Sequence, residues 1–450
     1  MSPTQRPLQA FTPKARESRR QFIQGSGLML AGGTMLAGSL DVARAAHPFG
    51  SGRIKLGLIG CGVRGTAAAM QALGTSGGDV ELVAMADLFE DRLNASHRAI
   101  KSRFADQVGL RGGRFHGLDG YRGVLASDAD VVMLATPPGF RPLQFEAAVA
   151  AGKHVFMEKP LATDAPGVRR VLAANQAAME KGLAVSVGFQ RRHEPRYQQC
   201  VEKLHDGAIG EFVFARAYWN ANGTKPAPRS PGQTELEYQI RHWKSFPWIG
   251  GDLLTEQHVQ NLDVMNWVMQ STPKLAQGQG GRWAEHDGRA ARGTAVSPET
   301  RDGEADRFDH HMVEFVYDQS DAGEVHLISQ CRQARGRWNR VGEFVHGTLG
   351  TCDLSDGVIR DRRGNVLWQS DATDRAGKGW QRAQQDLFDA LRKGQPMNEV
   401  PQAAASTMTA IMGRIASATG KLVKWEDVMS GTTSGADIDR IVSLDCPAPV

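Results

Sequence analysis

Residues 54–65, Ile-Lys-Leu-Gly-Leu-Ile-Gly-Cys-Gly-Val-Arg-Gly, join an apolar run of strand length directly to a glycine-rich turn. The turn places Gly60, Gly62 and Gly65 in the spacing G-x-G-x-x-G, and the stretch TAAAMQALG that follows has a helical pattern. In such a unit the first glycine makes the tight turn, the second lets the backbone approach a pyrophosphate, and the third lets helix pack on strand. Since the positive end of the helix then faces the anion, this stretch predicts a dinucleotide site.

A second apolar run, VELVAMAD, follows the helix and ends in Asp87. A carboxylate at the tip of this strand can accept hydrogen bonds from ribose hydroxyls, and it would repel a 2'-phosphate. The next residues, Leu88 and Phe89, offer no cation, although Arg92 is near. The sequence therefore favours NAD without excluding NADP. A glycine-rich turn without a ligand is the alternative, and the presence of both parts argues against it.

Strand-like runs alternate with amphipathic stretches from residue 53 to about residue 190; the runs are LGLIG, VELVAMAD, DVVMLATPP, KHVFMEKP and LAVSVGFQ. This alternation predicts a parallel sheet covered by helices. The segments Thr136-Pro137-Pro138 and Glu158-Lys159-Pro160 each end a strand, because proline disfavours a helix there. Both turns should lie at the carboxyl edge of the sheet, beside the cofactor.

Beyond residue 190 the strand-like runs follow one another without helices between them, which predicts an antiparallel sheet. We expect an α/β Rossmann domain at 52–190 and an α+β domain with an open, largely antiparallel sheet at 191–425. A long helix is expected from about 252 to 270, and a loose tail at 426–450. The stretch from about 277 to 307, rich in Gly, Arg and Ala, is typical of a surface loop.

The first 45 residues have the pattern of a twin-arginine export signal. The segment SRRQFI at 18–23 precedes a weakly apolar run at 25–40 and the sequence Ala-Arg-Ala at 43–45. A membrane anchor and a disordered tail are the alternatives, but the run is short and weakly apolar for an anchor. We expect the twin-arginine machinery to export the folded chain and release a periplasmic protein without a membrane span.

Composition excludes some partners. Six of the 53 basic residues and two of the 49 acidic residues lie within the first 45 positions, which leaves equal numbers of each in the remainder. A neutral body gives no reason to expect nucleic acid. The five cysteines show neither C-x-x-C nor zinc spacing, so we expect no disulfide framework and no structural metal.

Six segments, in order and spacing, resemble the glucose-fructose oxidoreductase and inositol dehydrogenase family, Gfo/Idh/MocA: LGLIGCGVRG, Asp87, ATPP, MEKP, GFQRRHEPRY and GGDLLTEQHVQNLDVMNW. The resemblance runs from about Arg53 to Gly420. It implies a Rossmann domain followed by a domain whose sheet covers the nicotinamide, and assembly into homo-oligomers through that sheet. It also implies NAD or NADP chemistry on sugars and polyols.

The resemblance implies cofactor contacts at the glycine turn and the neighbouring loops: Gly60, Gly62, Val63, Arg64, Gly65, Asp87, Thr136, Pro137, Glu158 and Lys159. It also implies that Lys159 hydrogen-bonds the reacting hydroxyl. The family's Asp-x-x-x-His element aligns with residues 256–260, so Gln260 stands where the family has histidine. This is a departure, since glutamine can orient a hydroxyl but cannot take up a proton near neutral pH.

The candidate catalytic residues are therefore Lys159, Glu256, His258 and Gln260. On an ideal helix Glu256 and Gln260 share one face with Asp263, whereas His258 lies on the apolar side. His258 is then a core residue, unless an irregular first turn after two glycines presents it to the site. The candidate substrate contacts are Arg191, His193, Trp243, Asp263 and His310, for which surface or packing roles are the alternatives.

Three functions are compatible with these patterns. The leading hypothesis is a periplasmic NAD(P)-dependent oxidoreductase that acts on a carbohydrate and recycles a tightly bound cofactor internally. The second is an NAD-dependent glycoside hydrolase that uses transient oxidation. The third is a non-catalytic protein that binds sugar or NAD, since Gln260 replaces the family's base.

Overall fold

The computed structural model describes residues 52–223, 228–282, 307–319, 323–372, 378–431 and 438–449. The chain divides into two compact units, 1–40 and 41–450, and every described residue belongs to the second. The expected export signal and most of the expected surface loop at 277–307 lie outside the described residues. None of the described helices combines the length and apolar character that crossing a membrane requires.

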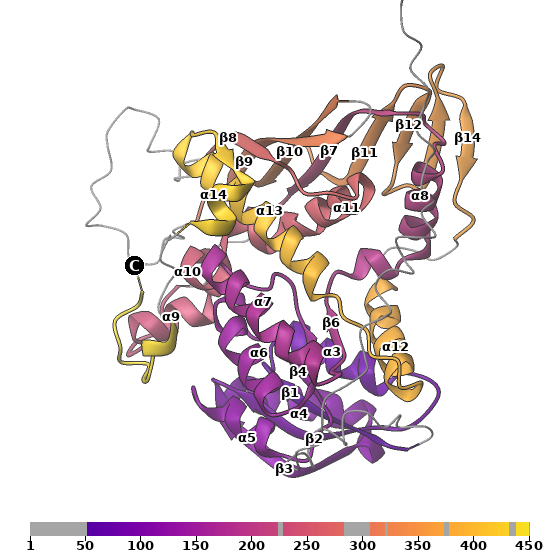
Figure 1. Ribbon diagram of the computed structural model, residues 1–450. Helices are drawn as coiled ribbons and strands as arrows, with labels where there is room; N and C mark the ends of the chain where they lie inside the picture. Colours follow the sequence, from indigo (N-terminus) through magenta and orange to yellow (C-terminus); the bar gives the residue numbers. More distant parts are fainter. Residues whose placement is uncertain are drawn as a thin grey trace, which may run out of the picture. The chain divides into compact units, whose positions relative to one another are not determined.

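A six-stranded parallel sheet forms the amino-terminal domain, with the strand order β3-β2-β1-β4-β5-β6 (Figure 1). Its strands are β1 (Ile54–Ile59), β2 (Val80–Asp87), β3 (Val108–His116), β4 (Val131–Leu134), β5 (His154–Met157) and β6 (Val185–Val187). The helices between them are α3 (Val63–Leu73), α4 (Glu90–Arg103), α5 (Gly120–Ala126), α6 (Arg141–Ala150) and α7 (Ala165–Glu180). The predicted Rossmann fold is confirmed. Its topological switch point lies between β1 and β4, where a nucleotide crevice is expected.

Strand β3 was not among the strands that the sequence predicted. Its sequence, VGLRGGRFH, is interrupted by glycines and arginines, and its residues are only partly buried or exposed. β3 is an edge strand beside β2, so it needs no continuous apolar run.

A nine-stranded sheet forms the second domain, in the order β14-β13-β12-β11-β7-β10-β9-β8-β15. Its strands are β7 (Phe212–Ala221), β8 (Leu275–Gly281), β9 (His310–Gln319), β10 (Gly323–Gln333), β11 (Arg340–Gly347), β12 (Gly350–Asp353), β13 (Val358–Asp361), β14 (Val366–Gln369) and β15 (Val423–Lys424). All pairings are antiparallel except the parallel pair of β7 and β10. The predicted, largely antiparallel sheet is thus confirmed.

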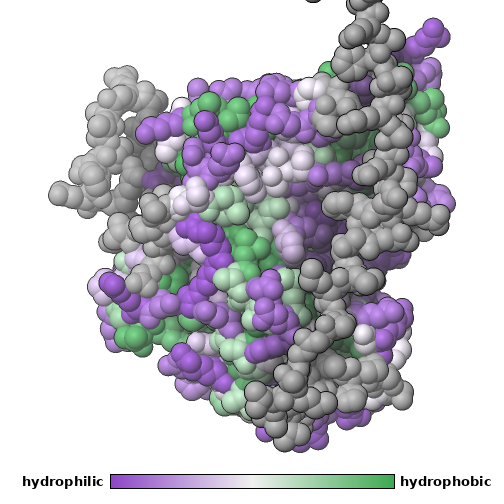
Figure 2. All heavy atoms as spheres, in the orientation of Figure 1, coloured by the Kyte–Doolittle hydropathy of each residue, from purple (hydrophilic) through white to green (hydrophobic). Residues whose placement is uncertain are grey.

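Helices cover one face of this sheet and meet the Rossmann domain. They are α8 (Pro195–His205), α11 (Val259–Met269) and α13 (Val400–Thr419), and α13 also packs against α7 (Figure 1). Figure 2 shows hydrophobic residues gathered in the middle of this view, where α7 and α13 lie in Figure 1, and a mainly hydrophilic surface elsewhere. One buried apolar cluster contains residues of both domains, including Val168 of α7 and Met408 of α13, so the two domains share an apolar contact.

Helix α12 (Gly379–Arg392) follows the second sheet in sequence but packs on the first domain. Its buried Leu387, Phe388 and Leu391 belong to the same cluster as residues of β1 and α3. The core of the Rossmann domain therefore includes residues from far outside the predicted range 52–190.

The helix expected from about 252 to 270 begins irregularly. Gly251 and Asp252 have left-handed φ angles of 83° and 74°, and a π-helical turn, η5 (Leu254–His258), precedes α11. A π turn shifts the side chains that follow it relative to an ideal helix, so the helical faces assumed in the sequence analysis do not apply to residues 254–258.

The carboxy-terminal residues, for which the sequence predicts a loose tail, include α14 (Trp425–Ser430) and the short turn η7 (Ile438–Arg440). Ile438, Ile441 and Leu444 pack on a cluster that contains Phe89 and Phe140 of the Rossmann domain. Apolar contacts thus replace the expected loose tail over residues 438–449, which we call the carboxy-terminal strap.

Candidate active site

The glycine turn has the geometry that a pyrophosphate requires. Gly60 has a φ of +99°, and a Cβ there would lie 2.6 Å from the backbone of Ala135; a Cβ on Gly65 would lie 1.9 Å from the carbonyl oxygen of Gly60. Around Gly62, by contrast, a Cβ would meet no described atom within 4 Å. The amino end of α3 has no side-chain cap and no acidic residue in its first turn. Its backbone N–H groups are therefore directed at open space that fits the phosphates of a dinucleotide.

Asp87 supports this turn from the end of β2. Its Oδ2 accepts a hydrogen bond from the Cys61 N–H at 2.6 Å, and its Oδ1 accepts one from the Phe89 N–H at 2.9 Å. Burial raises the pKa of the carboxyl, while these two N–H donors act in the opposite direction. The carboxylate thus fixes the turn, and because each oxygen has a second lone pair it can still accept from a ribose hydroxyl.

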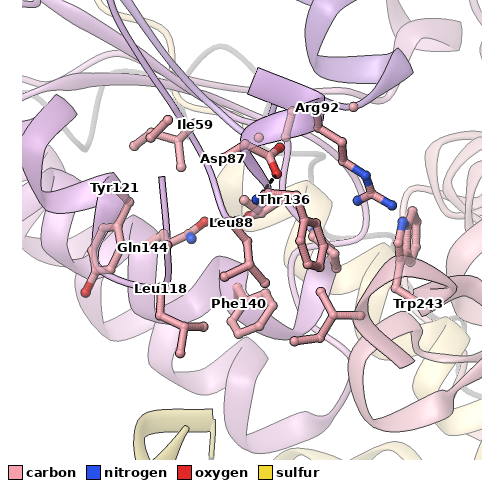
Figure 3. A pocket seen from close by; sticks show the side chains of 18 residues that line it. Ile59, Asp87, Leu88, Arg92, Leu118, Tyr121, Thr136, Phe140, Gln144 and Trp243 are labelled. Atoms are coloured by element: carbon pink, nitrogen blue, oxygen red, sulfur yellow. Dashed lines mark hydrogen bonds between the residues drawn. The ribbon is translucent and has the colours of Figure 1, made fainter. Parts of the chain in front are cut away.

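A cleft of about 660 Å³, open to solvent, lies at the switch point and includes Gly60, Gly62, Asp87, Thr136 and Pro137 in its lining. Figure 3 shows Arg92 and Trp243 at one end of this cleft and Tyr121 and Leu118 at the other. Trp243 and Ile240 reach it from the second domain, through η4 (Trp243–Ser245) and α9 (Glu235–Arg241).

Two of the expected cofactor contacts bind each other. Arg64 Nε donates a hydrogen bond of 2.6 Å to Glu158 Oε1, and the Arg64 guanidinium lies 5.3 Å from the centre of the Trp380 ring. Their ion pair ties α3 to the loop after β5. Val63, between Gly62 and Arg64, is 92% exposed, so it is free to contact a ligand at the turn.

Lys159 and Glu256 meet where the two domains meet. Lys159 Nζ donates to the backbone carbonyl of Glu256, and Lys244 Nζ lies 3.5 Å from Glu256 Oε1. Burial lowers the pKa of Lys159, against the opposing effect of the Glu256 and Glu158 carboxylates. The structure therefore brings together a lysine that loses its proton more readily than usual and a carboxylate.

His258 is the last residue of η5, two residues after Glu256. Its side chain has no exposed surface, and its Nε2 is 2.8 Å from Ser329 Oγ of β10. Burial lowers the pKa of its imidazole to about 3. This geometry favours the core alternative for His258. Gln260, which is 7% exposed, has no hydrogen-bond partner for its Oε1 among the described residues.

Asp263 and Arg191, both proposed as substrate contacts from the sequence, belong instead to buried ion pairs. Asp263 accepts hydrogen bonds from Arg192 Nε at 2.9 Å and from Ser406 Oγ at 2.8 Å. Arg191 pairs with Glu343 of β11. Their partners are far away in sequence, so no local pattern could have revealed them.

His193 bridges two carboxylates, with Nδ1 2.6 Å from Asp386 Oδ2 and Nε2 3.2 Å from Glu399 Oε1. Burial alone would lower the pKa of its imidazole, but the two carboxylates outweigh burial and raise it to about 9. His310, at the start of β9, lies 2.7 Å from Asp309. Of the five proposed substrate contacts, only Trp243 lines the cleft described above.

Two residues of this region were missed by the sequence analysis. Lys244 is adjacent to Trp243, and Arg141 lies three residues after the Thr136-Pro137-Pro138 turn that was expected beside the cofactor. Arg141 is 2% exposed and donates hydrogen bonds to the backbone carbonyls of Thr136 and Pro160. The available signal for Arg141 was a cation three residues after the first of the two expected turns, whereas its contact with the second turn is visible only in the structure.

Comparison with known proteins adds independent findings. A family profile described as "Oxidoreductase family, NAD-binding Rossmann fold" (GFO_IDH_MocA) matches residues 54–189. An inositol 2-dehydrogenase of Rhizobium meliloti (strain 1021) is 32% identical over 297 residues, which is 66% of this chain and 74% of that protein. A levoglucosan dehydrogenase solved with NADH and levoglucosan superimposes with a TM-score of 0.61 at 18% identity, covering 83% of this chain and 99% of that one.

Other similarities are shorter. A dTDP-3,4-didehydro-2,6-dideoxy-alpha-D-glucose 3-reductase of Actinomadura kijaniata is 34% identical over 144 residues, which is 31% of this chain and 40% of that protein. For this reductase, and for an inositol 2-dehydrogenase of Saccharopolyspora erythraea matched over 57% of its length, the alignment spans less than two thirds of the relative.

Proposed function

This chain belongs to the Gfo/Idh/MocA oxidoreductase family, and from that premise we propose that it transfers hydride between NAD and a hydroxyl-bearing carbon of a sugar or polyol. The observation that carries the proposal is the position of Lys159. It follows β5 at the carboxyl edge of the parallel sheet, where the glycine turn also lies, and its Nζ contacts the second domain at Glu256. Related proteins with inositol and levoglucosan in their names support a polyol or sugar as substrate.

The protein residues have separate tasks in this reaction. Bound NAD would supply the hydride acceptor or donor. Lys159 would hold the reacting hydroxyl and take its proton, which the lowered pKa of its amine favours. The free Oε1 of Gln260 can accept a hydrogen bond from a substrate hydroxyl without taking up its proton.

We propose that NAD is preferred over NADP. Asp87 lines the cleft, and its carboxylate would repel a 2'-phosphate, whereas Arg92 in the same lining would attract one. The carboxylate has the stronger position because backbone N–H groups hold both of its oxygens. Titration of both cofactors onto the wild type and Asp87→Ala tests this; tighter binding of NADP than NAD by the wild type would reverse the assignment.

We further propose that the protein is exported to the periplasm with its cofactor and regenerates the cofactor in place. The leader pattern at 1–45 supports export, and no NAD pool is expected outside the cytoplasm. Retention is supported by the strap, which packs behind the cleft-lining residues Phe89, Phe140 and Ile240. The reaction would then be redox-neutral, with hydride returned to a second sugar or to the same one.

The test uses purified, cofactor-loaded protein mixed with candidate polyols, sugars and glycosides without added NAD. Products and the absorbance of reduced nicotinamide are followed together, with Lys159→Met as the inactive control. Many turnovers without accumulating NADH support internal recycling. A strict need for added NAD, with one NADH released per product, contradicts recycling but keeps the dehydrogenase. Cleaved glycosides would indicate a hydrolase, and no turnover would remove the enzymatic proposal.

A further inference from the structure

Arg141 occupies an unusual place for an arginine. It is the first residue of α6, it directly follows the short turn η2 (Pro138–Phe140), and only 2% of it is exposed. It is one of the largest fully enclosed side chains among the described residues. Arginine is almost never buried so completely unless it is paired, since removing its charge from water is costly.

The hydrogen bonds of Arg141 join the two turns of the candidate site. Nη2 donates to the carbonyl oxygen of Thr136 at 2.6 Å, and Nη1 donates to the carbonyl oxygen of Pro160. Thr136 lines the cofactor cleft, and Pro160 directly follows Lys159. One planar guanidinium thus connects the turn after β4 to the turn that carries the lysine.

These bonds do not compensate the charge as a carboxylate would. Neither acceptor is ionised, and Arg141 Nε has no hydrogen-bond partner among the described residues. Burial lowers the pKa of the guanidinium to about 10, and the more distant carboxylates of Glu158 and Glu256 act in the opposite direction. A buried cation with this environment lowers stability compared with an apolar residue of the same size. Its location beside Lys159 suggests what it contributes in return.

We propose that Arg141 is a positioning residue, which fixes the backbone on the carboxyl side of Lys159 relative to the cofactor turn and thereby sets where the lysine amine meets the reacting hydroxyl. This inference rests on the proposed function only for the role of the lysine. The planar fork of arginine suits this task, because it binds two carbonyl oxygens at a fixed separation, which the single ammonium of lysine does with less geometric constraint.

The pKa of Lys159 should also depend on the presence of Arg141. The charged groups that act on its amine come from four elements: Glu256 of η5, Glu158 of the loop after β5, Lys244 of η4 and Arg141 of α6. Arg141 and Lys244 lower the pKa of Lys159, and the two carboxylates raise it. Removing the guanidinium deletes a like charge and opens the turn to water, so both changes should raise the pKa of Lys159 toward its ordinary value.

The experiment compares Arg141→Met and Arg141→Lys with the wild type by kcat, KM, the pH dependence of kcat and the NAD dissociation constant. We expect kcat of Arg141→Met to fall by about 100-fold, because a small displacement of a catalytic group is that costly, with NAD affinity nearly unchanged. Arg141→Lys, which keeps the positive charge but not the planar fork, should recover part of the loss. The pH profile of Arg141→Met should move to higher pH, and that of Arg141→Lys should move less.

The matched control is Lys153→Met. Lys153 Nζ also donates to two backbone carbonyls, those of Ser127 and Ala129, at 2.9 and 2.8 Å, but it lies directly before β5 rather than after its carboxyl end. This variant should lose stability and keep its kcat per folded molecule. An equal loss of kcat in Lys153→Met, or a kcat in Arg141→Met within about twofold of the wild type, would overturn the proposal.

A second readout does not need turnover. Reductive ¹³C-methylation of the lysines and NMR titration give the pKa of Lys159, with Lys159→Met used to assign its signal. A higher pKa in Arg141→Met, with a smaller rise in Arg141→Lys, supports the proposal even if no sugar is turned over, which would be a failure of the proposed function alone. If Arg141→Met does not fold, Arg141→Lys carries the test, and an unchanged kcat in it would contradict the inference.

Discussion

The glycine turn at 60–65 and the helical segment at 254–263 both belong to the candidate site, but their polar groups are used differently. In the turn, the amino end of α3 has no side-chain cap, and the space around Gly62 is open. In the helical segment, His258 and Asp263 are bonded to Ser329 and Arg192. The turn can therefore bind a ligand without losing internal hydrogen bonds, whereas His258 and Asp263 already use their polar groups in hydrogen bonds within the second domain.

Lys159 lies between these two regions and gives the largest expected effect. Lys159→Met should lower turnover by about 1,000-fold, because it removes the proton acceptor, while the NAD affinity stays near the wild-type value. Glu256→Gln, which keeps the backbone carbonyl that Lys159 contacts, should have a smaller effect. Stopped-flow turnover and cofactor titration measure the two quantities separately. Full activity in Lys159→Met would show that Lys159 is not the proton acceptor.

Two glycine substitutions test whether different glycines of the turn serve ligand binding and folding. Gly62 has a φ of −69° and open space around it, so Gly62→Ala should fold normally and bind NAD about 10- to 100-fold more weakly. Gly65→Ala would place a Cβ 1.9 Å from the Gly60 carbonyl oxygen, so it should lower the free energy of unfolding by about 2 to 3 kcal/mol. Urea denaturation and NAD titration of both variants check this, and equal effects on folding would contradict the separation.

Two buried histidines should give stability profiles of opposite sign. His193, whose pKa is raised to about 9, stabilises the fold fully below pH 6.5 and loses this contribution as the pH rises from 6.5 to about 9. His258, whose pKa is lowered to about 3, is buried neutral, so its contribution is present above pH 6.5 and is lost as the pH falls toward 3. At about 1.4 kcal/mol per pKa unit, the pH-dependent contribution is about 3 kcal/mol for His193 and about 5 kcal/mol for His258.

The measurement is the free energy of unfolding in urea from pH 4 to pH 10. His193→Gln should flatten the alkaline side of the profile, and His258→Gln should flatten the acid side. Turnover per folded molecule should stay normal in His258→Gln if the residue belongs to the core. A selective loss of turnover with unchanged stability would instead place His258 in the site.

The smallest expected effect concerns the carboxy-terminal strap. Deleting residues 438–450 removes the side chains packed behind Phe89, Phe140 and Ile240, and NAD should dissociate about tenfold faster. The control is Asp439→Asn, which removes only the half-exposed ion pair with Arg170 and should change the rate by less than about twofold. Fluorescence of bound NADH after dilution measures both rates. An unchanged dissociation rate in the deletion variant would show that the strap does not contribute to cofactor retention.

The same contrast explains what could be predicted from the sequence. The glycine turn and the strands β1, β2, β4 and β5 were predictable because their geometry depends on neighbouring residues and on continuous burial. His193 was not predictable as a bridge, because its partner Asp386 lies 193 residues away. The irregular start of the helical segment before α11 was foreseeable from the two preceding glycines, whereas its π-helical form at 254–258 was not, because no periodic pattern marks it.

The position of the strap also sets an order of events during synthesis. Thr234 Oγ1 donates to the carbonyl oxygen of Leu444, 210 residues later, and Asp439 pairs with Arg170, 269 residues earlier. The Rossmann strands and α9 therefore leave the ribosome long before the residues that back the cleft. If the cofactor is retained as proposed, this interval is when the dinucleotide would enter, because the strap residues that pack behind Phe89 and Phe140 have not yet been synthesised.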